Sequence, residues 1–487
     1  MDDWLGNRRA KIICTLGPST DTDEDVTRLI EGGMNAARLN LSFGTAEDHA
    51  RRVAQVRSIS KKLGRHVAII ADLPGPKVRL GKLASARVQL ERGAAVRFVL
   101  DQGQPAPGPS SGSAALHLPV GRRFFHDALI RGDRILLGDG IIELVITDVK
   151  PSDAGAEVVN GGEVSELTAV HIPGLPLKEG PVWEEDRPFL ELAVKHEVDY
   201  VALTYVRDAN DLLGVREHLE KLGRSVPIIA KIERSEAFAR LDGILGRADA
   251  VMMRRGDLGA EIEMTRVPLV QKEVVRLANN RGVPVIIATQ MLGSMIDNPR
   301  PTRAEASDVF NAIADGVDGV MLSSETAVGK HPHRALDMMN RIVMEAERAH
   351  HDRHRAHELI SYPSPFPDAI ARGAVKAARE ASVSLIICFT ESGKSSGLMA
   401  KYRPDIPIVA FCPSSEVERR VALQWGVQAD NMESVGDVEA MIQRVDTRLL
   451  ERGVSKRGDR IAIVFGAPVG EMGHTNSVRL HQVGRSD

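Results

Sequence analysis

The segment Pro227-Ile-Ile-Ala-Lys-Ile-Glu233 shows the pattern that decides the fold of this chain. It is short, it is apolar on both sides of the strand alternation, and it ends in charged residues. A strand with two apolar sides is typical of a parallel sheet that is covered on both faces. Seven further runs share this character, at 10–16, 36–42, 67–73, 200–206, 250–254, 284–290 and 319–324.

Stretches with helical spacing separate most of these runs, for example 23–31, 48–63, 208–222 and 267–280. Eight strand-then-helix units predict an α/β protein built on a closed (β/α)8 TIM barrel. An open doubly wound sheet remains the structural alternative, because the order of the strands is not visible in a sequence.

The distance between the third and fourth runs is too long for a connection and predicts an inserted domain. Its β-type segments, at 86–90, 96–100, 134–137 and 141–146, predict a small β-barrel lid. After residue 345 the pattern changes, and strands expected at 385–389, 408–411 and 460–465 predict a C-terminal α/β domain. The predicted division is 1–76 with 175–345 for the TIM barrel, 77–174 for the lid and 346–487 for the C-terminal domain.

Composition and charge exclude several classes of protein. The chain has 487 residues, and 63 Lys and Arg against 66 Asp and Glu give a net charge of −3. A protein that binds nucleic acid or an anionic membrane needs a clustered basic surplus, which this sequence lacks. No apolar run approaches the ~18 residues of a membrane helix, and the first residues are acidic where a secretory signal is basic. Cys14, Cys388 and Cys412 give no disulfide framework, so we expect a cytoplasmic protein.

A charged segment at 347–358 contains four histidines, His350, His351, His354 and His357. Their helical spacing is compatible with a metal site. Because no constellation of carboxylates or cysteines accompanies them, a solvated helix that leads to a linker is the favoured interpretation.

Polar residues at the ends of the predicted strands are the candidates for chemistry, because barrel enzymes carry function at the carboxyl ends of their strands. Arg38, Asn40 and Ser42 alternate along the second run, so their side chains project to one side. Lys231 and Glu233 do the same on the fifth run. Any one pair is equally consistent with a structural ion pair, but five strand ends that meet at one mouth favour a site. Further candidates at or after strand ends are Asp72, Leu73, Lys77, Arg79, Gly256, Asp257 and Thr289.

These residue types suit one kind of chemistry. Glu233 and Asp257 offer the hard oxygen ligands that Mg²⁺ prefers. Arg38, Arg79 and Lys231 are positive charges that fit a phosphoryl group in transfer. A metal, several cations and few nucleophile–base pairs favour phosphoryl or enolate chemistry over acyl transfer.

Six blocks of the sequence resemble the signature blocks of the pyruvate kinase family, in that family's order and spacing. They are Lys11-Ile-Ile-Cys-Thr-Leu-Gly-Pro, Met34-Asn-Ala-Ala-Arg-Leu-Asn-Leu-Ser, Ile229-Ala-Lys-Ile-Glu, Arg255-Gly-Asp-Leu-Gly, Ala288-Thr-Gln-Met-Leu and Pro301-Thr-Arg-Ala-Glu-Ala-Ser-Asp-Val. The resemblance runs nearly end to end and includes a glycine-rich turn at 466–476. It implies a three-domain glycolytic enzyme, usually a homotetramer, that transfers the phosphoryl group of phosphoenolpyruvate to ADP and yields pyruvate and ATP.

The resemblance also implies roles, carried over position by position. Lys231 is the implied catalytic residue that stabilises the phosphoryl group and the enolate oxygen. Arg38 is expected on the phosphate and Thr289 on the substrate. Gly256 and Asp257 are expected to meet the substrate carboxylate.

Three further groups of residues complete the implied site. Glu233 and Asp257 match the ligands of the divalent ion, Mg²⁺ or Mn²⁺. Arg79 matches a position on the nucleotide side. The residues that match the monovalent-cation site are Asn40, Ser42, Asp72 and, through its carbonyl, Leu73.

Lys77 departs from the pattern of the potassium-dependent members, which have glutamate at this position. Members with lysine here resemble K⁺-independent enzymes, so an ammonium group in place of K⁺ is the favoured interpretation. The alternative is a lysine that is merely solvated. We therefore expect turnover without K⁺.

The nucleotide side departs further from the family. Phe43 stands where a histidine is usual, Thr168 replaces a lysine of the lid, and Arg254 replaces a small residue before the Arg-Gly-Asp block. The guanidinium of Arg254 either restores part of the missing positive charge or points into solvent. These departures leave open a phosphoenolpyruvate-dependent phosphotransferase with another acceptor. A metal-dependent C–C lyase that handles pyruvate enolate and a non-catalytic metabolite sensor are further alternatives.

The segment Thr390-Glu-Ser-Gly-Lys-Ser-Ser resembles the effector loop of the family. Small residues of this kind can cradle a phosphate, so a sugar phosphate or a nucleotide is a candidate effector. The segment is not a P-loop, because the upstream glycine is absent, and a plain strand-to-helix turn is an equal alternative.

Overall fold

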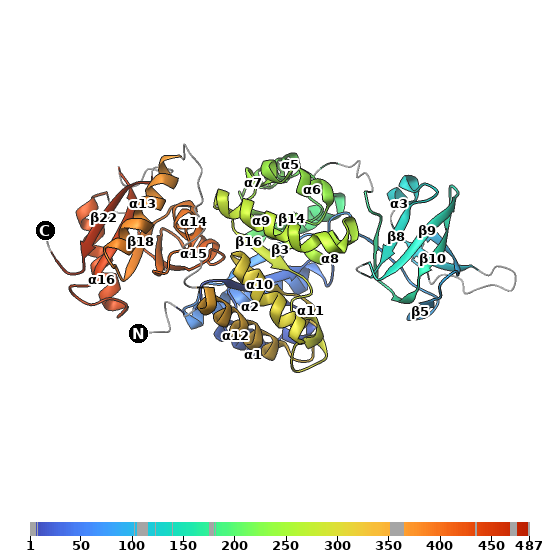
Figure 1. The fold of residues 1–487 in the computed structure, drawn as a ribbon, viewed down its shortest axis with the longest axis horizontal. Coiled ribbons are helices and arrows are strands. Elements are labelled where there is room, and N and C mark those ends of the chain that lie inside the picture. Colours follow the sequence, from blue (N-terminus) through green and yellow to red (C-terminus); the bar gives the residue numbers. More distant parts are fainter. Residues whose placement is uncertain are drawn as a thin grey trace.

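The computed structural model describes residues 6, 8–101, 103–104, 115–121, 123–138, 140–174, 180, 182–350, 365–433, 436–467 and 475–485. Three regions lie in a row (Figure 1). A barrel occupies the middle, the C-terminal α/β region lies on one side of it, and the inserted β region lies on the other.

Eight parallel strands close the central barrel in the order β1-β17-β16-β15-β14-β13-β3-β2. They are β1 (Lys11–Leu16), β2 (Ala36–Asn40), β3 (Ala68–Asp72), β13 (Tyr200–Leu203), β14 (Ile228–Ile232), β15 (Ala250–Arg254), β16 (Val285–Ala288) and β17 (Gly319–Leu322). Each predicted run contains one of these strands. Because β1 pairs with both β2 and β17, the sheet is closed, which confirms the barrel and excludes the open doubly wound sheet.

Helices follow the barrel strands and cover the outside of the barrel (Figure 1). They are α1 (Asp23–Glu31), α2 (Ala46–Leu63), α4 (Arg187–Lys195), α5 (Ala209–Lys221), α6 (Ser235–Ala239), α7 (Leu241–Leu245), α8 (Arg255–Glu261), α9 (Val267–Arg281), α10 (Arg303–Asp315), α11 (Ser324–Ala327) and α12 (Pro332–His350), with short 3₁₀ turns at Pro18–Thr20, Glu184–Asp186, Met264–Arg266 and Gly293–Ile296. Thr22, Thr45 and Thr302 begin three of the helices, since each side chain accepts a hydrogen bond from the backbone N–H three residues further on.

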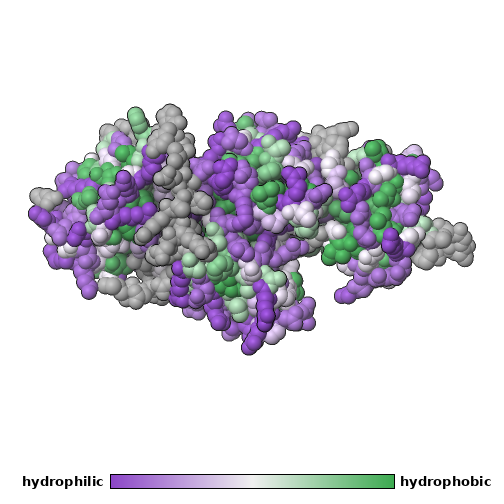
Figure 2. Space-filling view, viewed as in Figure 1, coloured by the Kyte–Doolittle hydropathy of each residue, from purple (hydrophilic) through white to green (hydrophobic). Residues whose placement is uncertain are grey.

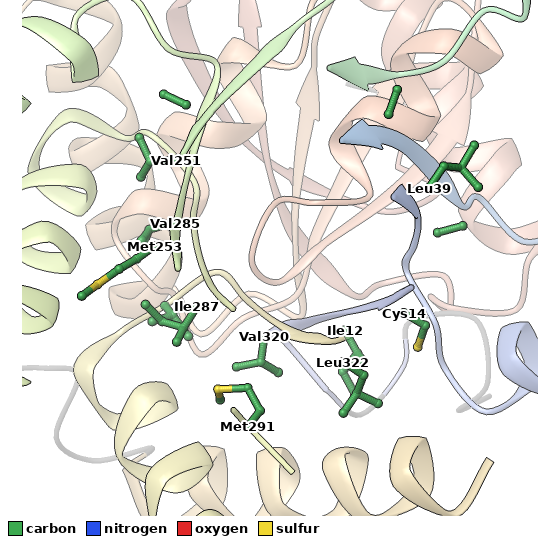
Figure 3. Close-up of a cluster of buried hydrophobic side chains, with 14 of the residues drawn as sticks. Ile12, Cys14, Leu39, Val251, Met253, Val285, Ile287, Met291, Val320 and Leu322 are labelled. Carbon is green, nitrogen blue, oxygen red and sulfur yellow. The ribbon is translucent and has the colours of Figure 1, made fainter. Parts of the chain in front are cut away.

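The alternation of side chains on the barrel strands produces two cores. The outer core joins the strands to the surrounding helices, and Figure 3 shows buried members of it from neighbouring strands, among them Val251, Met253 and Val320. The inner core fills the barrel with the intervening residues, such as Ile229 and Met252. Because both rows are apolar for most of each strand, a polar side chain on the inner row is exceptional and indicates function.

The inserted region is a small β-barrel whose two edge strands are joined by an isolated bridge. Its strands are β4 (Val78–Arg79), β5 (Arg87–Leu90), β6 (Ala95–Leu100), β7 (Leu116–Val120), β8 (Arg134–Leu137), β9 (Ile142–Val149), β10 (Asp153–Asn160), β11 (Gly162–Ser165) and β12 (Ala169–His171), and its helix is α3 (Arg123–Ala128). Seven strands form a sheet in the order β4-β12-β8-β9-β10-β6-β7, while β5 pairs with β11. The isolated bridge between Leu80 and Val120 joins the two ends of the seven-stranded sheet.

The C-terminal region is a five-stranded sheet in the order β20-β19-β18-β21-β22. Its strands are β18 (Leu385–Phe389), β19 (Ile408–Cys412), β20 (Val427–Asn431), β21 (Arg460–Gly466) and β22 (Thr475–Gln482), and its helices are α13 (Phe366–Glu380), α14 (Lys394–Lys401), α15 (Ser415–Val421) and α16 (Val438–Glu451). The three predicted strands are present, and β20 and β22 are additional. Much of the histidine segment, together with the side chain of His350 and most of the glycine-rich turn at 466–476, lies outside the described residues.

The C-terminal region covers the amino ends of the barrel strands. The ammonium of Lys11, at the start of β1, donates to the carbonyl of Val427 at 2.8 Å. The guanidinium of Arg403 forms ion pairs of 2.8 and 3.1 Å with Asp318, the residue before β17. The inserted region and the C-terminal region therefore lie at opposite ends of the barrel (Figure 1), which leaves the carboxyl ends of the strands to the lid.

The surface mixes hydrophilic and hydrophobic residues. Figure 2 shows both kinds over all three regions, with hydrophobic residues gathered over the inserted region, which carries the exposed side chains of Ile130 and Ile141. Within the described part of the chain, the helices are all too short or too polar to cross a membrane. The three cysteines are buried free thiols, in agreement with the expected lack of a disulfide framework.

Candidate active site

Polar side chains continue the inner rows of the barrel at the carboxyl ends of the strands. On β14, Ile229 belongs to the inner core, Lys231 follows it on the same side, and Glu233 lies just beyond the strand. The same alternation brings Asp72 of β3 and Arg38 of β2 to the mouth of the barrel. The structure therefore unites predicted site residues that lie far apart in the sequence.

Lys231 lies at the centre of this group and is held in place by its neighbours. Its ammonium donates to Oδ1 of Asp72 at 2.8 Å and to Oγ1 of Thr204 at 2.6 Å, and it lies 3.5 Å from Oε1 of Glu233. Thr204 in turn donates its hydroxyl proton to the carbonyl of Leu73 at 2.5 Å. With only 1% of Lys231 exposed, the positive charge is fixed in a nearly dry environment, where electrostatic stabilisation is strongest.

Asp72 joins Arg38 and Lys231, two of the three cations predicted to serve phosphate chemistry. Its Oδ2 accepts from Nε of Arg38 at 2.6 Å, and Nη1 of Arg38 also donates to Oγ1 of Thr15 at 3.1 Å. Burial alone would raise the pKa of the Asp72 carboxyl, but Arg38 and Lys231 outweigh it and hold that pKa well below its usual range. Asp72 therefore stays ionised and orients both cations.

Glu233 and Asp257 share two cations. Nη1 of Arg254 lies 2.9 Å from Oε1 of Glu233 and 3.0 Å from Oδ2 of Asp257. Nζ of Lys77 lies 3.3 Å from Oε1 of Glu233 and 2.9 Å from Oδ1 of Asp257. The remaining Glu233 oxygen, Oε2, accepts from the backbone N–H of Tyr205 at 3.0 Å. The two carboxylates therefore lie close together and share the same two cations.

Burial and charge act in opposite directions on these groups. Burial would raise the pKa of Asp257, but Arg254 and Lys77 beside it hold that pKa far below its usual range. The pKa of Glu233 is lowered in the same way, by Lys231 and Lys77 against the effect of burial. Burial also lowers the pKa of Lys77, an effect that the nearby Arg254 reinforces. Both carboxylates are therefore ionised.

Lys77 lies with the predicted ligands of the divalent ion. The family resemblance predicts its ammonium at the monovalent-cation site, whereas its ion pairs in the structure are with Glu233 and Asp257. The ammonium also lies 5.4 Å from the ring centroid of Tyr205. Of the predicted monovalent-cation ligands, Asn40 accepts from the backbone N–H of Ser42 at 3.3 Å. That Lys77 replaces K⁺ stays a prediction.

The end of β15 and the end of β16 meet at the other side of the mouth. The backbone N–H of Gly256 donates to Oγ1 of Thr289 at 3.3 Å, and Arg255 donates to the carbonyl of Thr289 at 3.0 Å while it pairs with Asp308. Thr289 and Gln290 have φ values of 71° and 55°, in the left-handed region that L-residues avoid. Such local strain is typical of functional sites and costs about 1–3 kcal/mol for each residue.

The residues predicted to lie on the nucleotide side come from the inserted region and from the chain just after β2. Arg79 donates to the carbonyl of Leu167 at 2.9 Å, and its guanidinium carbon lies 5.2 Å from the ring centroid of Phe43. Oγ1 of Thr168 accepts from the backbone N–H of Ser165 at 3.1 Å. Nδ1 of His171 lies 3.2 Å from the hydroxyl of Tyr205, and its Nε2 lies 3.6 Å from Asp257. The lid therefore contacts the carboxylate pair directly.

The predicted effector loop connects β18 to α14. The hydroxyl of Thr390 accepts from the backbone N–H of Gly393 at 2.9 Å, and the hydroxyl of Ser396 donates to the carbonyl of Gly393 at 3.0 Å. Gly393 has a φ of 88°, which explains why glycine stands at this position. The loop is thus a strand-to-helix turn, and its role in effector binding stays a prediction.

Comparisons with known proteins agree with this geometry. A family model described as "Pyruvate kinase, barrel domain" matches residues 7–336, and one described as "Pyruvate kinase, alpha/beta domain" matches residues 368–481. The chain belongs to the pyruvate kinase family. A protein of Mycobacterium tuberculosis (strain CDC 1551 / Oshkosh) named pyruvate kinase is 40% identical over 480 residues, which cover 99% of each chain.

Two further relatives with the name pyruvate kinase show the same extent of similarity. The protein of Corynebacterium glutamicum is 39% identical over 98% of each chain. The protein of Geobacillus stearothermophilus is 38% identical over 98% of this chain and 80% of its own length. The family resemblance that the sequence blocks indicated is therefore confirmed over nearly the whole chain.

Pyruvate kinases generally need a divalent metal ion, and the carboxylate pair fits one in its chemistry. Glu233 and Asp257 are ionised, buried and directed at a common position that already holds cationic nitrogens. In the described part of the chain, His, Cys, Asp and Glu form no group of three that could hold an ion. An ion at Glu233 and Asp257 would therefore take its other ligands from substrate and water, as Mg²⁺ commonly does.

Sequence reasoning assigned no role to three residues that shape the site. Thr204 follows the inner-row residue Ala202 by two positions, so strand alternation alone would have found it. Tyr205 and His171 come from different regions of the chain, and no spacing in the sequence indicates that they meet. The sequence left the direction of Arg254 open, although the alternation along β15 places its side chain on the inner row with Ala250 and Met252.

Proposed function

We propose that this protein transfers the phosphoryl group of phosphoenolpyruvate to ADP and releases pyruvate and ATP, the last step of glycolysis. Membership of the pyruvate kinase family supports the reaction, and the family's enzymes are phosphotransferases acting on phosphoenolpyruvate and pyruvate. The observation that carries the proposal is the position of Lys231. Its ammonium is buried, fixed by Asp72 and Thr204, and adjacent to the carboxylate of Glu233, which shares Lys77 and Arg254 with Asp257.

Lys231 and Arg38 stabilise the charge that moves during the reaction. When the phosphorus–oxygen bond of phosphoenolpyruvate breaks, negative charge develops on the phosphoryl oxygens and on the enolate oxygen. Arg38 faces the phosphate and Lys231 faces both groups, so the two cations reduce the cost of that charge. Asp72 keeps both side chains in place, which spares their reorganisation during the step.

Gly256, Asp257 and Thr289 position the rest of the substrate. The backbone at Gly256 offers N–H groups to the substrate carboxylate, since glycine permits a close approach. Thr289 contacts the substrate and orients it for protonation of the enolate carbon, which completes pyruvate. Arg79 lies on the nucleotide side, where its guanidinium meets the phosphates of ADP or ATP.

Glu233 and Asp257 hold the divalent ion, Mg²⁺ or Mn²⁺. When bound, such an ion neutralises phosphoryl oxygens and helps to orient them. Lys77 supplies a fixed positive charge beside the same carboxylates, which supports turnover without K⁺. The monovalent-cation ligands Asn40, Ser42, Asp72 and Leu73 remain proposed on the resemblance alone.

Several properties of the family extend the proposal. We propose a cytoplasmic homotetramer, regulated by a sugar phosphate or a nucleotide at the loop 390–396. The division into a barrel (1–76 and 175–345), a lid (77–174) and an effector domain (346–487) belongs to the same proposal. Binding of nucleic acid or of a membrane has no place in it.

A lactate-dehydrogenase-coupled assay with Mg²⁺, phosphoenolpyruvate and ADP tests the reaction. We expect NADH consumption in buffer free of K⁺ and Na⁺, together with formation of ATP. Pyruvate formation that requires K⁺ would overturn the role of Lys77 and leave the reaction intact. An absence of ATP in the assay, with transfer to another member of a nucleoside-diphosphate panel, would show that the acceptor is not ADP.

A further inference from the structure

Arg254 occupies the inner row of the barrel at the point where β15 ends. Ala250 and Met252 precede it on the same side of the strand and belong to the inner core. Lys231 of β14 pairs with Met252 of β15 in the parallel register, so one step of two residues places Glu233 beside Arg254. The direction of the Arg254 side chain toward the carboxylates therefore follows from the strand itself.

One nitrogen of Arg254 contacts both carboxylates and places a positive charge between them. Nη1 lies 2.9 Å from Glu233 and 3.0 Å from Asp257, so a single cationic atom bridges the two carboxylates. Oδ1 of Asp257 and Oε1 of Glu233 also accept from Lys77. All four carboxylate oxygens therefore have a nitrogen 2.9 to 3.0 Å away before any ion arrives.

The cations of the mouth exceed its carboxylates by one charge without an added ion. Three buried carboxylates, Asp72, Glu233 and Asp257, face four cations, Arg38, Lys77, Lys231 and Arg254. Lys77 and Arg254 together carry two positive charges, which equals the charge of one divalent ion. A buried carboxylate without a positively charged partner is strongly destabilised. Lys77 and Arg254 supply that positive charge, which a metal ion would otherwise have to supply.

We propose that Arg254 is a built-in competitor for the divalent ion, which neutralises Glu233 and Asp257 in the ion-free protein and leaves them when the ion binds. The proposal rests on the proposed function, because the ion site is the same. It makes Arg254 the residue that sets the affinity of this chain for its metal.

Arg254 is the most exposed of the charged groups at the carboxylate pair. Its side chain is 20% exposed, whereas that of Glu233 is fully buried, so the arginine is the member of the group with access to solvent. Its Nε is buried and has no hydrogen-bond partner among the described residues. Rotation of the side chain toward solvent would allow water to satisfy Nε, which offsets part of the energy lost with the carboxylates.

Titration of the ion-free protein with Mn²⁺ alone, followed by the electron paramagnetic resonance signal of free Mn²⁺, tests the proposal. For Arg254→Ala we expect a dissociation constant about 10- to 100-fold lower than for the wild type, because the competing charged hydrogen bonds are gone. Arg216→Ala is the matched control. It removes an arginine that pairs with Asp249 outside the site, and its Mn²⁺ affinity should equal that of the wild type.

Two further variants keep the test decisive. Arg254→Gln removes the charge and retains a polar side chain, and it replaces Arg254→Ala if the latter does not fold. Arg254→Ala with Asp257→Asn should lose the gained affinity, which places the ion at the carboxylate pair. Equal Mn²⁺ affinity in the wild type and in the Arg254 variants would overturn the proposal, as would tight binding that survives Asp257→Asn.

The two hypotheses fail separately. Formation of ATP from phosphoenolpyruvate by the wild type, with no change in Mn²⁺ affinity on replacement of Arg254, would refute the competitor and leave the proposed function standing. A gain in Mn²⁺ affinity without any phosphoryl transfer by the wild type would refute the proposed function and support the competitor.

Discussion

Single side chains determine the electrostatics of the barrel mouth. Asp72 is paired with both Arg38 and Lys231, so one buried carboxylate fixes two cations at once. Lys77 and Arg254 each form ion pairs with both Glu233 and Asp257 and so neutralise these two carboxylates. Cations on both sides of the mouth explain how a strongly charged site is accommodated in a barrel whose remaining interior is apolar.

Replacement of Lys77 tests the proposed turnover without K⁺ at the scale of one residue. In K⁺-free buffer, Lys77→Met should lower kcat about tenfold or more, because a fixed charge worth roughly 1.5–3 kcal/mol in hydrogen bonding is lost from the site. Added K⁺ should restore part of the activity. Lys61→Met, which changes an exposed lysine of α2, should behave like the wild type. A Lys77→Met enzyme with the activity of the wild type at every K⁺ concentration would contradict the assigned role.

The connection after β3 shows how an element positions the site. Gly75 has a φ of 61°, and its N–H donates to Asp186 at 2.9 Å. A Cβ atom at this position would lie 2.6 Å from Cβ of Thr204, the residue that supports Lys231. The chain can therefore turn toward the lid here only because the residue is glycine.

Gly75→Ala should lower both stability and turnover. The left-handed conformation costs about 1–2 kcal/mol for alanine, and the contact with Thr204 adds about 1–3 kcal/mol of overpacking. Gly64→Ala is a matched control, because Gly64 also has a φ of 61° but nothing within 4 Å of its added Cβ. Thermal midpoints and kcat for both variants check the prediction. Equal loss of kcat in the two variants would show that Thr204 is not displaced.

The barrel elements were predictable and two elements of the C-terminal sheet were not. The eight barrel strands are apolar on both sides, so their pattern is visible in the sequence. β20 contains Asp430, which is buried through ion pairs with Arg448 and Arg452, so its polarity hides a buried strand. β22 is the last strand of its sheet, and several of its side chains are exposed.

The same distinction applies to the site. Strand alternation placed Lys231 and Glu233 together, because it depends only on local geometry. The contact of Lys77 with Asp257 joins positions 180 residues apart, and that of His171 with Tyr205 joins the lid to the barrel. Such contacts depend on the angle at which the lid meets the barrel, which no local pattern encodes.

At the scale of the whole molecule, the C-terminal region closes the end of the barrel opposite the lid. Lys11 contributes to this contact from a buried position, and its pKa is lowered to about 7 by burial and then by the nearby Arg8. The unfolded chain keeps the proton of this lysine up to its usual pKa of about 10.4. Between these two pKa values the unfolded state binds more protons than the folded state, so stability rises with pH.

Lys11→Met removes this dependence. The free energy of unfolding of the wild type relative to Lys11→Met should rise as the pH increases from about 7 toward 10, by at most about 1.4 kcal/mol for each pH unit. Thermal midpoints of the two proteins measured across this pH range check the rise. Below pH 7 the difference should be constant, because Lys11 is protonated in both states. Lys195→Met, at an exposed position of α4, should follow the wild type at every pH. A difference for Lys11→Met that does not change with pH would refute the prediction.

The most direct test of the whole account is the rate of pyruvate and ATP formation by Lys231→Met. Loss of the ammonium should reduce kcat about a hundredfold or more, as the removal of a group that stabilises transition-state charge does elsewhere. Circular dichroism should show a folded protein, and Lys221→Met, which alters an exposed lysine of α5, should retain full activity. A Lys231→Met enzyme as fast as the wild type would contradict the account, because the transition state would then not depend on the Lys231 ammonium.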